Sequence, residues 1–498
     1  MTAHPGPRPR PALLAILLAA LIGTLLAASA TPAAAAPGRP FTNPVKAQKG
    51  ADPWLEYFNG NYYLITTTFT NELLMRKSPT LAGLAAAPSV QVWTDNTAGR
   101  NANFWAPEIH FINNRWYLYY SGAQAGAPCC DTQRTHVLES VGTDPMGPYI
   151  YRNMLTGPQL NPGGWLIDAS VLRLNGGLYL LGSGSIGGSR QSLVIAPMSN
   201  PVTVSGGFSV ISSPTLAWEQ QGGIVNEAPV ALQRGGRTFI VYSASACWGP
   251  DYKLGRLTHN GGNPLSASSW SKAPNPVFQR SDAAGVYGPG HNGFFTSPDG
   301  TENWIVYHAN DAVGDGCDNG RTTRAQRFTW NADGTPNFGT PVRLGGTLDG
   351  PAGETAATPA TYTVVNRNSG KCLEVAGSSA ADGANIVQNT CTGGANQRWR
   401  FEDLANDTSR LVSAATGKVA DVANCGTADG ADIRQWTWLN NACQRFRIVS
   451  TAAGGWVRLV NVNSGKVADV ADCGTADGAD VRQWAWLNNN CQQWQLRP

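Results

Sequence analysis

A single strand–turn–strand phrase recurs five times in this chain, and it restricts the possible folds more than any other feature. Each copy has an apolar stretch, a turn rich in Gly, Asn or Asp, and then aromatic and β-branched residues, the pattern of a β-hairpin. The copies start at Tyr57, His110, Val171, Val230 and Gly293, which lie 53, 61, 59 and 63 residues apart. That spacing leaves room for about four short strands per copy, the size of one propeller blade. We therefore predict an all-β fold in which residues 45–350 form a five-bladed β-propeller.

A polar residue stands just before each hairpin. These residues are Asp52, Glu108, Asp168, Glu227 and His291. Any one of them alone could be a satisfied structural group, but a carboxylate in an apolar run such as WLIDASVL is expensive to bury without a partner or a task. If the blades are equivalent, the five side chains occupy equivalent positions and converge on one axis. We expect a ring of carboxylates and an imidazole around a central cavity, and a hydrolase is the leading interpretation.

A different repeat occupies the end of the chain. GKVADVANCGTADGADIRQWTWLNNACQRF starts at Gly417, a near copy starts 48 residues later at Gly465, and a more diverged copy starts at Gly370. Three copies of this length predict a closed three-fold β unit. The region resembles the ricin B-chain-like β-trefoil lectins, also called carbohydrate-binding module family 13. We expect this unit to cover residues 362–498, after a linker at 351–361.

The resemblance implies sugar-binding sites in the trefoil. In that family an acidic residue early in a repeat accepts hydrogen bonds from sugar hydroxyls, and an aromatic ring about 15 residues later stacks on the sugar. The pairs that keep this pattern are Asp421 with Trp436 and Asp469 with Trp484. A trefoil that no longer binds sugar is the alternative.

The trefoil departs from its family in two respects. The first repeat has Glu374 but Asn389 in the aromatic position, so we expect its site to be weak or absent. The asparagine that the family often places before Gln-x-aromatic is replaced by cysteine in the other two repeats. Asn441 and Asn489 are the candidates to stand in for it.

The first part of the chain resembles glycoside hydrolase family 43, five-bladed propellers that act on arabinan, xylan and arabinoxylan side chains. The matching phrases are ADPWLEYFNGNYYL, FWAPEIHFINNRWYLYY, IDASVLRLNGGLYL, NEAPVALQRGGRTFIVYSAS and YGPGHNGFFTSPDGTENWIVYHA. The resemblance implies that Asp52 is the general base, Glu227 the general acid, and Asp168 the residue that orients and tunes the acid. It places Trp105 and Glu108 along the sugar subsite. It also implies that His291 lies under the cavity, where a calcium or sodium ion is held largely through water.

The same resemblance implies hydrolysis with inversion. Inverting enzymes keep their two carboxyl groups roughly 6.5–9.5 Å apart, which leaves room for a water molecule. An ionised Asp168 would raise the pKa of Glu227 by like-charge repulsion and keep it protonated near neutral pH.

Within the family, FWAPEIH, SWSKAPNPVF and RTTRAQRFTWNADGTPNFG look most like exo-acting α-L-arabinofuranosidases. The expected partners are therefore plant cell-wall polysaccharides, arabinan or arabinoxylan, with the lectin unit as an anchor. A β-xylosidase, an endo-1,5-arabinanase and a galactofuranosidase are alternatives with the same fold and mechanism, and a non-enzymatic carbohydrate-binding protein is a further alternative. The inserts at 122–135 and 310–324 could close one end of a cleft and so favour terminal sugars.

The N-terminus predicts export. Residues 1–36 have a basic start, an apolar core at 12–28 and a small-residue cleavage site at Ala34-Ala35-Ala36, as in a secretory signal peptide. We expect a secreted, extracellular protein. A formal net charge of +3 gives no electrostatic case for binding nucleic acid or an anionic membrane. We expect no organic cofactor, and a monomer.

The ten cysteines of an exported chain favour disulfides over zinc. Six are spaced 19, 18 and 18 residues apart in the trefoil region and suggest three local bridges: Cys372–Cys391, Cys425–Cys443 and Cys473–Cys491. The other four, Cys129, Cys130, Cys247 and Cys317, allow three pairings. A Cys129–Cys130 bridge with a Cys247–Cys317 bridge is one of these, and the sequence leaves the choice open.

Overall fold

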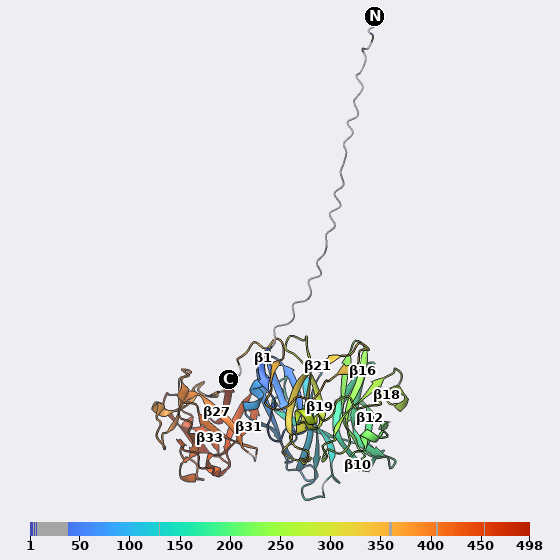
Figure 1. The fold of residues 1–498 in the computed structure, drawn as a ribbon. Helices are drawn as coiled ribbons and strands as arrows, with labels where there is room; N and C mark the ends of the chain where they lie inside the picture. The colour runs from blue at the N-terminus through green and yellow to red at the C-terminus, as the bar shows by residue number, and fades with distance from the viewer. Residues whose placement is uncertain are drawn as a thin grey trace. The chain divides into compact units, whose positions relative to one another are not determined.

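The fold was obtained as a computed structural model (Figure 1). The structure describes residues 1–2, 4, 6, 38–128, 130–357, 361–404, 407–452 and 454–498. The predicted secretory segment therefore lies almost entirely outside the described residues, as do Cys129 and residues 358–360 of the predicted linker. A bridge between Cys129 and Cys130, one of the three pairings left open, falls outside them for the same reason.

The described residues form strands and short 3-10 turns, and no α-helix occurs among them. No helix in this part of the chain has the length and apolar character needed to cross a lipid bilayer. The predicted all-β class is confirmed.

The propeller strands follow the predicted hairpins, which are β2–β3, β6–β7, β10–β11, β15–β16 and β19–β20. Each hairpin continues into further antiparallel strands. The first set is β2 (Trp54–Phe58), β3 (Asn61–Ile65), β4 (Glu72–Ser78) and β5 (Val90–Thr94). The second is β6 (Ala102–Ile112), β7 (Arg115–Ala123), β8 (Arg134–Ser140) and β9 (Tyr149–Leu155). The third is β10 (Leu160–Leu174), β11 (Gly177–Ile186), β12 (Ser192–Asn200), β13 (Thr203–Val204) and β14 (Ser209–Ser212).

The last two sets complete the propeller. They are β15 (Asn226–Arg234), β16 (Arg237–Ala244), β17 (Lys253–His259) and β18 (Trp270–Lys272), then β19 (Tyr287–Thr296), β20 (Asn303–Asn310), β21 (Thr322–Trp330) and β22 (Pro336–Asn337). Four of the five sets are separate sheets, whereas β2–β5 belongs to a larger sheet that continues through β5 into the trefoil. Strand β1 (Gly38–Thr42) pairs with β23 (Thr347–Gly350), which ties the start of the propeller region to its end.

The hairpin turns explain why these phrases fold locally. In four of them both central residues have positive φ: Asn59-Gly60, Asn113-Asn114, Asn175-Gly176 and Gly235-Gly236. A two-residue turn of type I′ requires positive φ at both positions, which Asn and Gly adopt at the lowest cost. The twist of that turn matches the twist of the flanking strands, so the sequence fixes the register of each hairpin.

The trefoil strands form three similar groups. They are β24 (Thr363–Asn366), β25 (Cys372–Val375), β26 (Ile386–Asn389) and β27 (Trp399–Leu404), then β28 (Thr408–Ser413), β29 (Val419–Val422), β30 (Ile433–Trp436) and β31 (Phe446–Ala452), then β32 (Trp456–Asn461), β33 (Val467–Val470), β34 (Ala479–Trp484) and β35 (Trp494–Arg497). The aromatic residue of each Gln-x-aromatic, which is Trp399, Phe446 or Trp494, is buried in the shared core. That burial explains why Gln-x-aromatic recurs near the end of every repeat.

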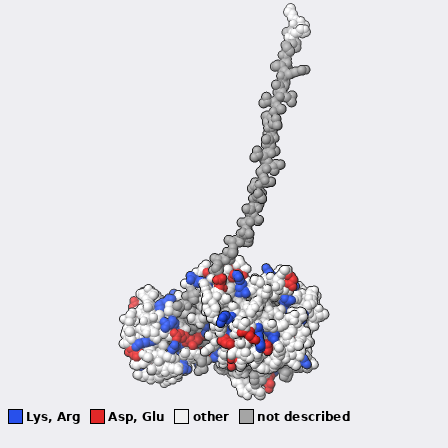
Figure 2. Space-filling model, in the orientation of Figure 1, with Lys and Arg blue, Asp and Glu red and all other residues white. Residues whose placement is uncertain are grey.

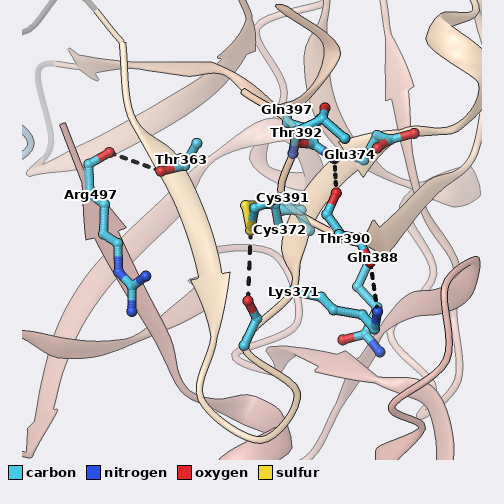
Figure 3. Close-up of a disulfide and its surroundings, with 12 residues drawn as sticks. Thr363, Lys371, Cys372, Glu374, Gln388, Thr390, Cys391, Thr392, Gln397 and Arg497 are labelled. Atoms are coloured by element: carbon cyan, nitrogen blue, oxygen red, sulfur yellow. Dashed lines mark hydrogen bonds between the residues drawn. A yellow bond between two sulfur atoms is a disulfide. The ribbon is translucent and has the colours of Figure 1, made fainter. Parts of the chain in front are cut away.

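Three disulfides close the trefoil repeats as predicted, between Cys372 and Cys391, Cys425 and Cys443, and Cys473 and Cys491. Figure 3 shows the first of them, with Glu374 and Gln397 nearby. A fourth bridge joins Cys247 to Cys317 in the propeller, which was one of the open alternatives.

The propeller and the trefoil are in direct contact. Strand β5 pairs in parallel with β31, and the Arg76 guanidinium pairs with the Asp403 carboxylate. Within the predicted linker, Ala352 donates its backbone N–H to Glu302 Oε2 at 3.0 Å. Lys and Arg side chains are intermingled with Asp and Glu on the face shown in Figure 2, over a largely uncharged surface.

Candidate active site

The site lies at the end of the propeller where each inner strand begins. In an antiparallel hairpin the start of the first strand lies beside the end of the second: Glu227 on β15 pairs with Ser243 near the end of β16. The loops that follow the second strands therefore lie at the same end as the predicted carboxylates. Four of these loops supply contacts to them, through Thr67, Gln191, Tyr252 and Arg321.

Each blade has one residue in the left-handed conformation, within its inner strand or just before it, that lies two positions before a paired residue. These residues are Asp52, Ala106, Asp168, Ala228 and His291, with φ of 52°, 46°, 54°, 51° and 45°. Regular pairing between the first two strands of each blade starts or resumes at Trp54, Glu108, Ser170, Val230 and Gly293. Positive φ is costly for such residues and is concentrated at functional sites, often at bulges.

This alignment corrects one prediction. Asp52, Asp168 and His291 are equivalent, as expected, but Glu108 and Glu227 are not. Glu227 stands one residue before the left-handed position of its blade, which Ala228 fills, and Glu108 stands two residues after that of its blade. The left-handed residue is common to all five blades, so Glu108 and Glu227 differ from the other three in their distance from it, which counting back from the hairpins does not reveal.

Asp52 is held as a carboxylate. Its Oδ1 accepts a hydrogen bond of 3.1 Å from the Arg321 guanidinium, and its Oδ2 accepts one of 2.5 Å from the Thr67 hydroxyl. Burial alone would raise the pKa of Asp52, but the charge of Arg321 overrides it and holds the pKa well below its usual value. A buried, ionised carboxylate of this kind is suited to accept a proton from water.

The surroundings of the two histidines next to Asp52 favour the neutral form of each ring. His291 Nδ1 and His308 Nδ1 each lie 3.3 Å from Asp52 Oδ1. Burial lowers the pKa of both rings, and that of His308 falls to about 4, with Arg321 adding to the effect. His308 Nδ1 also accepts the backbone N–H of Asp52 at 3.1 Å. The imidazole thus fixes the backbone of Asp52 without supplying a charge.

Glu227 has the opposite electrostatic character. Its Oε1 accepts the Tyr252 hydroxyl at 2.7 Å and its Oε2 accepts the Gln191 amide at 2.8 Å. Burial raises the pKa of Glu227 to about 7, and the negative charge of Asp52 adds to this. A carboxyl group with such a pKa is half-protonated at neutral pH and can donate a proton.

Asp168 lies close enough to Glu227 for the two to titrate together. Burial and the Glu227 carboxylate raise the pKa of Asp168 well above its usual value, and its Oδ2 accepts the backbone N–H of Ala228 at 3.0 Å. Burial favours the protonated form of both groups, so the direction of the Asp168 shift is opposite to the expectation of an ionised Asp168.

The other predicted propeller residues lie around this group. Glu108 is buried and pairs with His110 Nε2 at 2.8 Å, and its charge contributes to raising the pKa of Asp168. Trp105 packs edge-on against Phe69, with ring centroids 6.3 Å apart. Its indole N–H is buried with no partner among the described residues, and is a donor that a bound sugar hydroxyl would satisfy.

Sequence reasoning missed the residues that support the carboxylates: Thr67, Gln191, Tyr252, His308 and Arg321. Thr67, Gln191 and Tyr252 stand in or at the end of loops of ordinary composition, and no motif marks them. His308 and Arg321 lie in phrases that match the family, YGPGHNGFFTSPDGTENWIVYHA and RTTRAQRFTWNADGTPNFG, but nothing in those phrases singles them out. The Cys247–Cys317 bridge and the bond from Arg321 to the Cys317 carbonyl, at 3.4 Å, anchor the insert 310–324.

The residues around His291 do not by themselves build a metal site. The described residues contain no group of three or more His, Cys, Asp or Glu side chains arranged to hold an ion. The His291 ring contacts Asp52, and the charge of Arg321 acts on it as well. The neighbouring Asn292 amide is buried without a protein partner among the described residues, so its oxygen remains available. These groups fit an ion held mainly by water, and no chemical step is derived from one.

The two predicted lectin sites have the same construction. In the second repeat the Arg434 guanidinium lies 4.3 Å from the Trp436 ring centre, and its Nε lies 3.4 Å from Asp421 Oδ1. In the third repeat the corresponding distances are 4.4 Å from Arg482 to the Trp484 ring and 3.6 Å from Arg482 Nε to Asp469 Oδ1.

Asn441 and Asn489, the suggested stand-ins, each carry a buried side-chain oxygen without a partner among the described residues. Such an oxygen is available to a sugar hydroxyl. In the first repeat Asn389 and Gln397 donate to the two oxygens of Glu374, at 2.8 and 2.6 Å. The acidic group there is bonded within the protein, and a weak site in this repeat stays a prediction.

Comparisons with known proteins agree with both parts of the fold. Residues 41–336 match the family Glycosyl hydrolases family 43, and residues 348–436 and 442–498 match the Ricin-type beta-trefoil lectin domain-like family. The extracellular exo-alpha-(1->5)-L-arabinofuranosidase of Streptomyces avermitilis is 41% identical over 342 residues, which are 66% of this chain and 70% of that protein. Alpha-L-arabinofuranosidase 43 of Humicola insolens is 37% identical over 331 residues, 64% of this chain and 67% of that protein. The crystal structure of an alpha-L-arabinofuranosidase from Lactobacillus brevis superposes with a TM-score of 0.57 at 31% identity, covering 61% of this chain and 98% of that one.

Proposed function

The chain belongs to glycosyl hydrolases family 43, and from this we propose that it is a secreted, inverting exo-α-L-arabinofuranosidase acting on arabinan or arabinoxylan. One observation carries the proposal: two carboxyl groups of one site have opposite ionisation. Arg321 keeps Asp52 charged, while burial raises the pKa of Glu227 to about 7. Glycoside hydrolysis needs this combination of one base and one acid.

In the proposed mechanism Asp52 is the general base. Thr67 and Arg321 each occupy one lone pair of its carboxylate, which leaves further lone pairs to accept a hydrogen bond from the attacking water. The water attacks the anomeric carbon as its proton moves to Asp52. Glu227 gives its proton to the glycosidic oxygen as the bond to the leaving sugar breaks.

Asp168 is proposed to act through Glu227. The two carboxyl groups interact, so Asp168 favours the protonated form of Glu227. After each turnover Glu227 takes a new proton from solvent water, and Asp52 releases the proton that it accepted from the attacking water. Tyr252 and Gln191 hold the Glu227 carboxyl in place during the transfer. The proposed sugar contacts are Trp105 and Glu108.

The activity is tested by chromatography of products from debranched 1,5-arabinan, arabinoxylan and xylan. Release of arabinose alone supports exo-action on arabinofuranosyl groups. Arabino-oligosaccharides would show endo-action instead, and xylose alone would refute the arabinose assignment. Proton NMR during the first turnovers tests inversion, because an inverting enzyme releases β-arabinofuranose from an α-linked substrate.

We further propose that the trefoil anchors the enzyme to polysaccharide through the Asp421–Trp436 and Asp469–Trp484 sites. Holding the chain on an insoluble polymer raises the effective substrate concentration without changing the chemistry.

Export is proposed from the signal-like residues 1–36 and from the extracellular relative. A monomer and an axial calcium or sodium ion beside His291 complete the proposal, and sedimentation analysis and elemental analysis of the purified protein test them.

A further inference from the structure

One tryptophan of this chain stands apart from the others. Of 17 tryptophans, all within the part of the chain that the structure describes, Trp248 alone is an exposed side chain, at 62%. Leaving so large an apolar ring in water costs free energy that burial would recover, so its exposure calls for a reason. Ile224, exposed at 40%, lies in a segment that contacts the same loop.

Trp248 lies at the catalytic end of the propeller. Its loop, residues 245–252, follows β16, whose last residues pair with Asn226 and Glu227. Backbone bonds from Ser245 to Val225 and from Ala246 to Gln221, at 3.2 and 3.1 Å, join this loop to the segment that leads into Glu227. The loop then ends at Tyr252, which holds the Glu227 carboxyl.

The ring has a defined resting place. A Cβ atom added at Gly223 would lie 3.2 Å from Cζ2 of Trp248, so glycine there allows the indole edge to approach the backbone. On the other side, the adjacent Cys247 is bridged to Cys317. Cys317 belongs to the segment that also carries Arg321, the partner of Asp52. A ring whose edge rests on Gly223 and whose loop is anchored by a disulfide loses less entropy when a ligand stacks on it than a freely rotating one.

The position of Trp248 decides which sugar it would meet. Glu227 is the proposed acid and therefore faces the leaving-group oxygen, so a platform beside the Glu227 segment lies on the leaving-group side of the bond. Sugar rings carry apolar C–H faces that stack on indole rings. We propose that Trp248, with Ile224 nearby in the chain segment it contacts, stacks on the polymer sugar that bears the departing arabinofuranosyl group. This inference rests on the proposed function and adds a contact to the leaving-group side.

The test compares two substrates that differ in the leaving group. α-L-Arabinofuranosyl fluoride has no leaving sugar, whereas 1,5-arabinotriose has two. Trp248→Ala is expected to lower kcat/KM for arabinotriose about 5- to 20-fold, mainly through KM, and to leave the fluoride within twofold. Trp248→Phe should recover most of the loss, because a smaller aromatic face remains.

Val141→Ala is the matched control, since Val141 is exposed at 54% but follows β8 and so lies at the opposite end of the blades. Val141→Ala should leave kcat/KM unchanged for both substrates. Equal losses of Trp248→Ala on both substrates, or no loss on arabinotriose, would overturn the inference. If the unaltered protein hydrolysed neither substrate, the proposed function itself would fail and the inference with it, an outcome distinct from a failure confined to the variant.

Discussion

The hydroxyl of Tyr252 donates a hydrogen bond of 2.7 Å to Oε1 of Glu227. Its ring stacks on the His308 imidazole, with centroids 5.6 Å apart and planes 7° from parallel. Because His308 in turn accepts the backbone N–H of Asp52, one aromatic stack connects the supports of the proposed acid and base. The relation makes Tyr252 a positioning residue with a measurable effect on pH dependence.

Tyr252→Phe should move the alkaline limb of the kcat/KM profile to higher pH. The Tyr252 hydroxyl stabilises ionised Glu227 and lowers its pKa, so removing it should raise that pKa above about 7 and extend protonation of the acid. The profile is measured on arabinotriose between pH 4 and 9. Tyr119→Phe, which removes a bond to the Pro201 carbonyl elsewhere in the propeller, is the control and should not shift the limb. An unchanged limb in Tyr252→Phe would contradict the assignment of that limb to Glu227.

Arg321→Gln should move the acidic limb to higher pH. Arg321 is the charge that holds the pKa of Asp52 low, so without it burial raises that pKa and the base becomes protonated in mildly acidic solution. We expect a loss of about 10²-fold in kcat near pH 5 that is smaller at pH 7. Arg327→Gln is a matched control, because Arg327 is exposed and pairs with Glu302. A uniform loss at every pH would show that Arg321 acts on substrate binding and not through Asp52.

Glu227→Gln should abolish turnover of natural glycosides while the fold persists. Loss of the proton donor costs about 10²–10⁴-fold when the leaving group is a sugar alkoxide. A 2,4-dinitrophenyl arabinofuranoside, whose leaving group needs no proton, should lose far less. Comparing kcat/KM for the two substrates measures this difference, and circular dichroism checks the fold. Substantial activity on arabinotriose would remove Glu227 from the role of the acid.

The same variant should change how stability depends on pH. In the folded protein the pKa of Glu227 is about 7, against 4.5 for the free group. Between these values the folded state binds more protons than the unfolded state, so stability is fully present at low pH and falls as pH rises through 7. Glu227→Gln removes that loss. At pH 8 the variant should therefore be more stable than the unaltered protein by on the order of 1 kcal/mol, a reduced value because the Glu227 side chain is only partly buried. Thermal unfolding at pH 5 and pH 8 tests this, and an equal change in Tm for both proteins would refute it.

Retention on insoluble polysaccharide should depend on two trefoil sites. Trp436→Ala and Trp484→Ala should each weaken binding to arabinan or arabinoxylan several-fold, and the double variant should lose nearly all of it, because each removes one stacking face. Asn389→Ala in the first repeat is the control and should bind as before. Pull-down with the insoluble polymer measures retention, and kcat on arabinotriose should stay unchanged in all variants. Undiminished retention of the double variant would place the anchor elsewhere.

Much of the fold was predictable because its elements are local. The hairpins follow from Asn and Gly at positions such as Asn59-Gly60 that need positive φ, and each trefoil bridge joins cysteines 18 or 19 residues apart. The residue types of the site were visible for a related reason, since Asp52, Asp168 and Glu227 stand out in apolar surroundings. What failed was the assumed equivalence of Glu108 and Glu227 with the other three, because the position of the left-handed residue in each blade, occupied by Ala106 and Ala228 in these two, is not visible in the sequence.

The sequence by itself determined the all-β class, the two repeats, the local disulfides and the identity of the carboxylates. The tertiary structure decided what those carboxylates do. Arg321 reaches Asp52 across 269 residues of sequence, and Tyr252 and Gln191 reach Glu227 from two different blades. The pKa of a carboxyl group depends on its burial and on charges within a few ångströms. The packing of the blades around the axis therefore decides which carboxyl group is ionised and which keeps its proton.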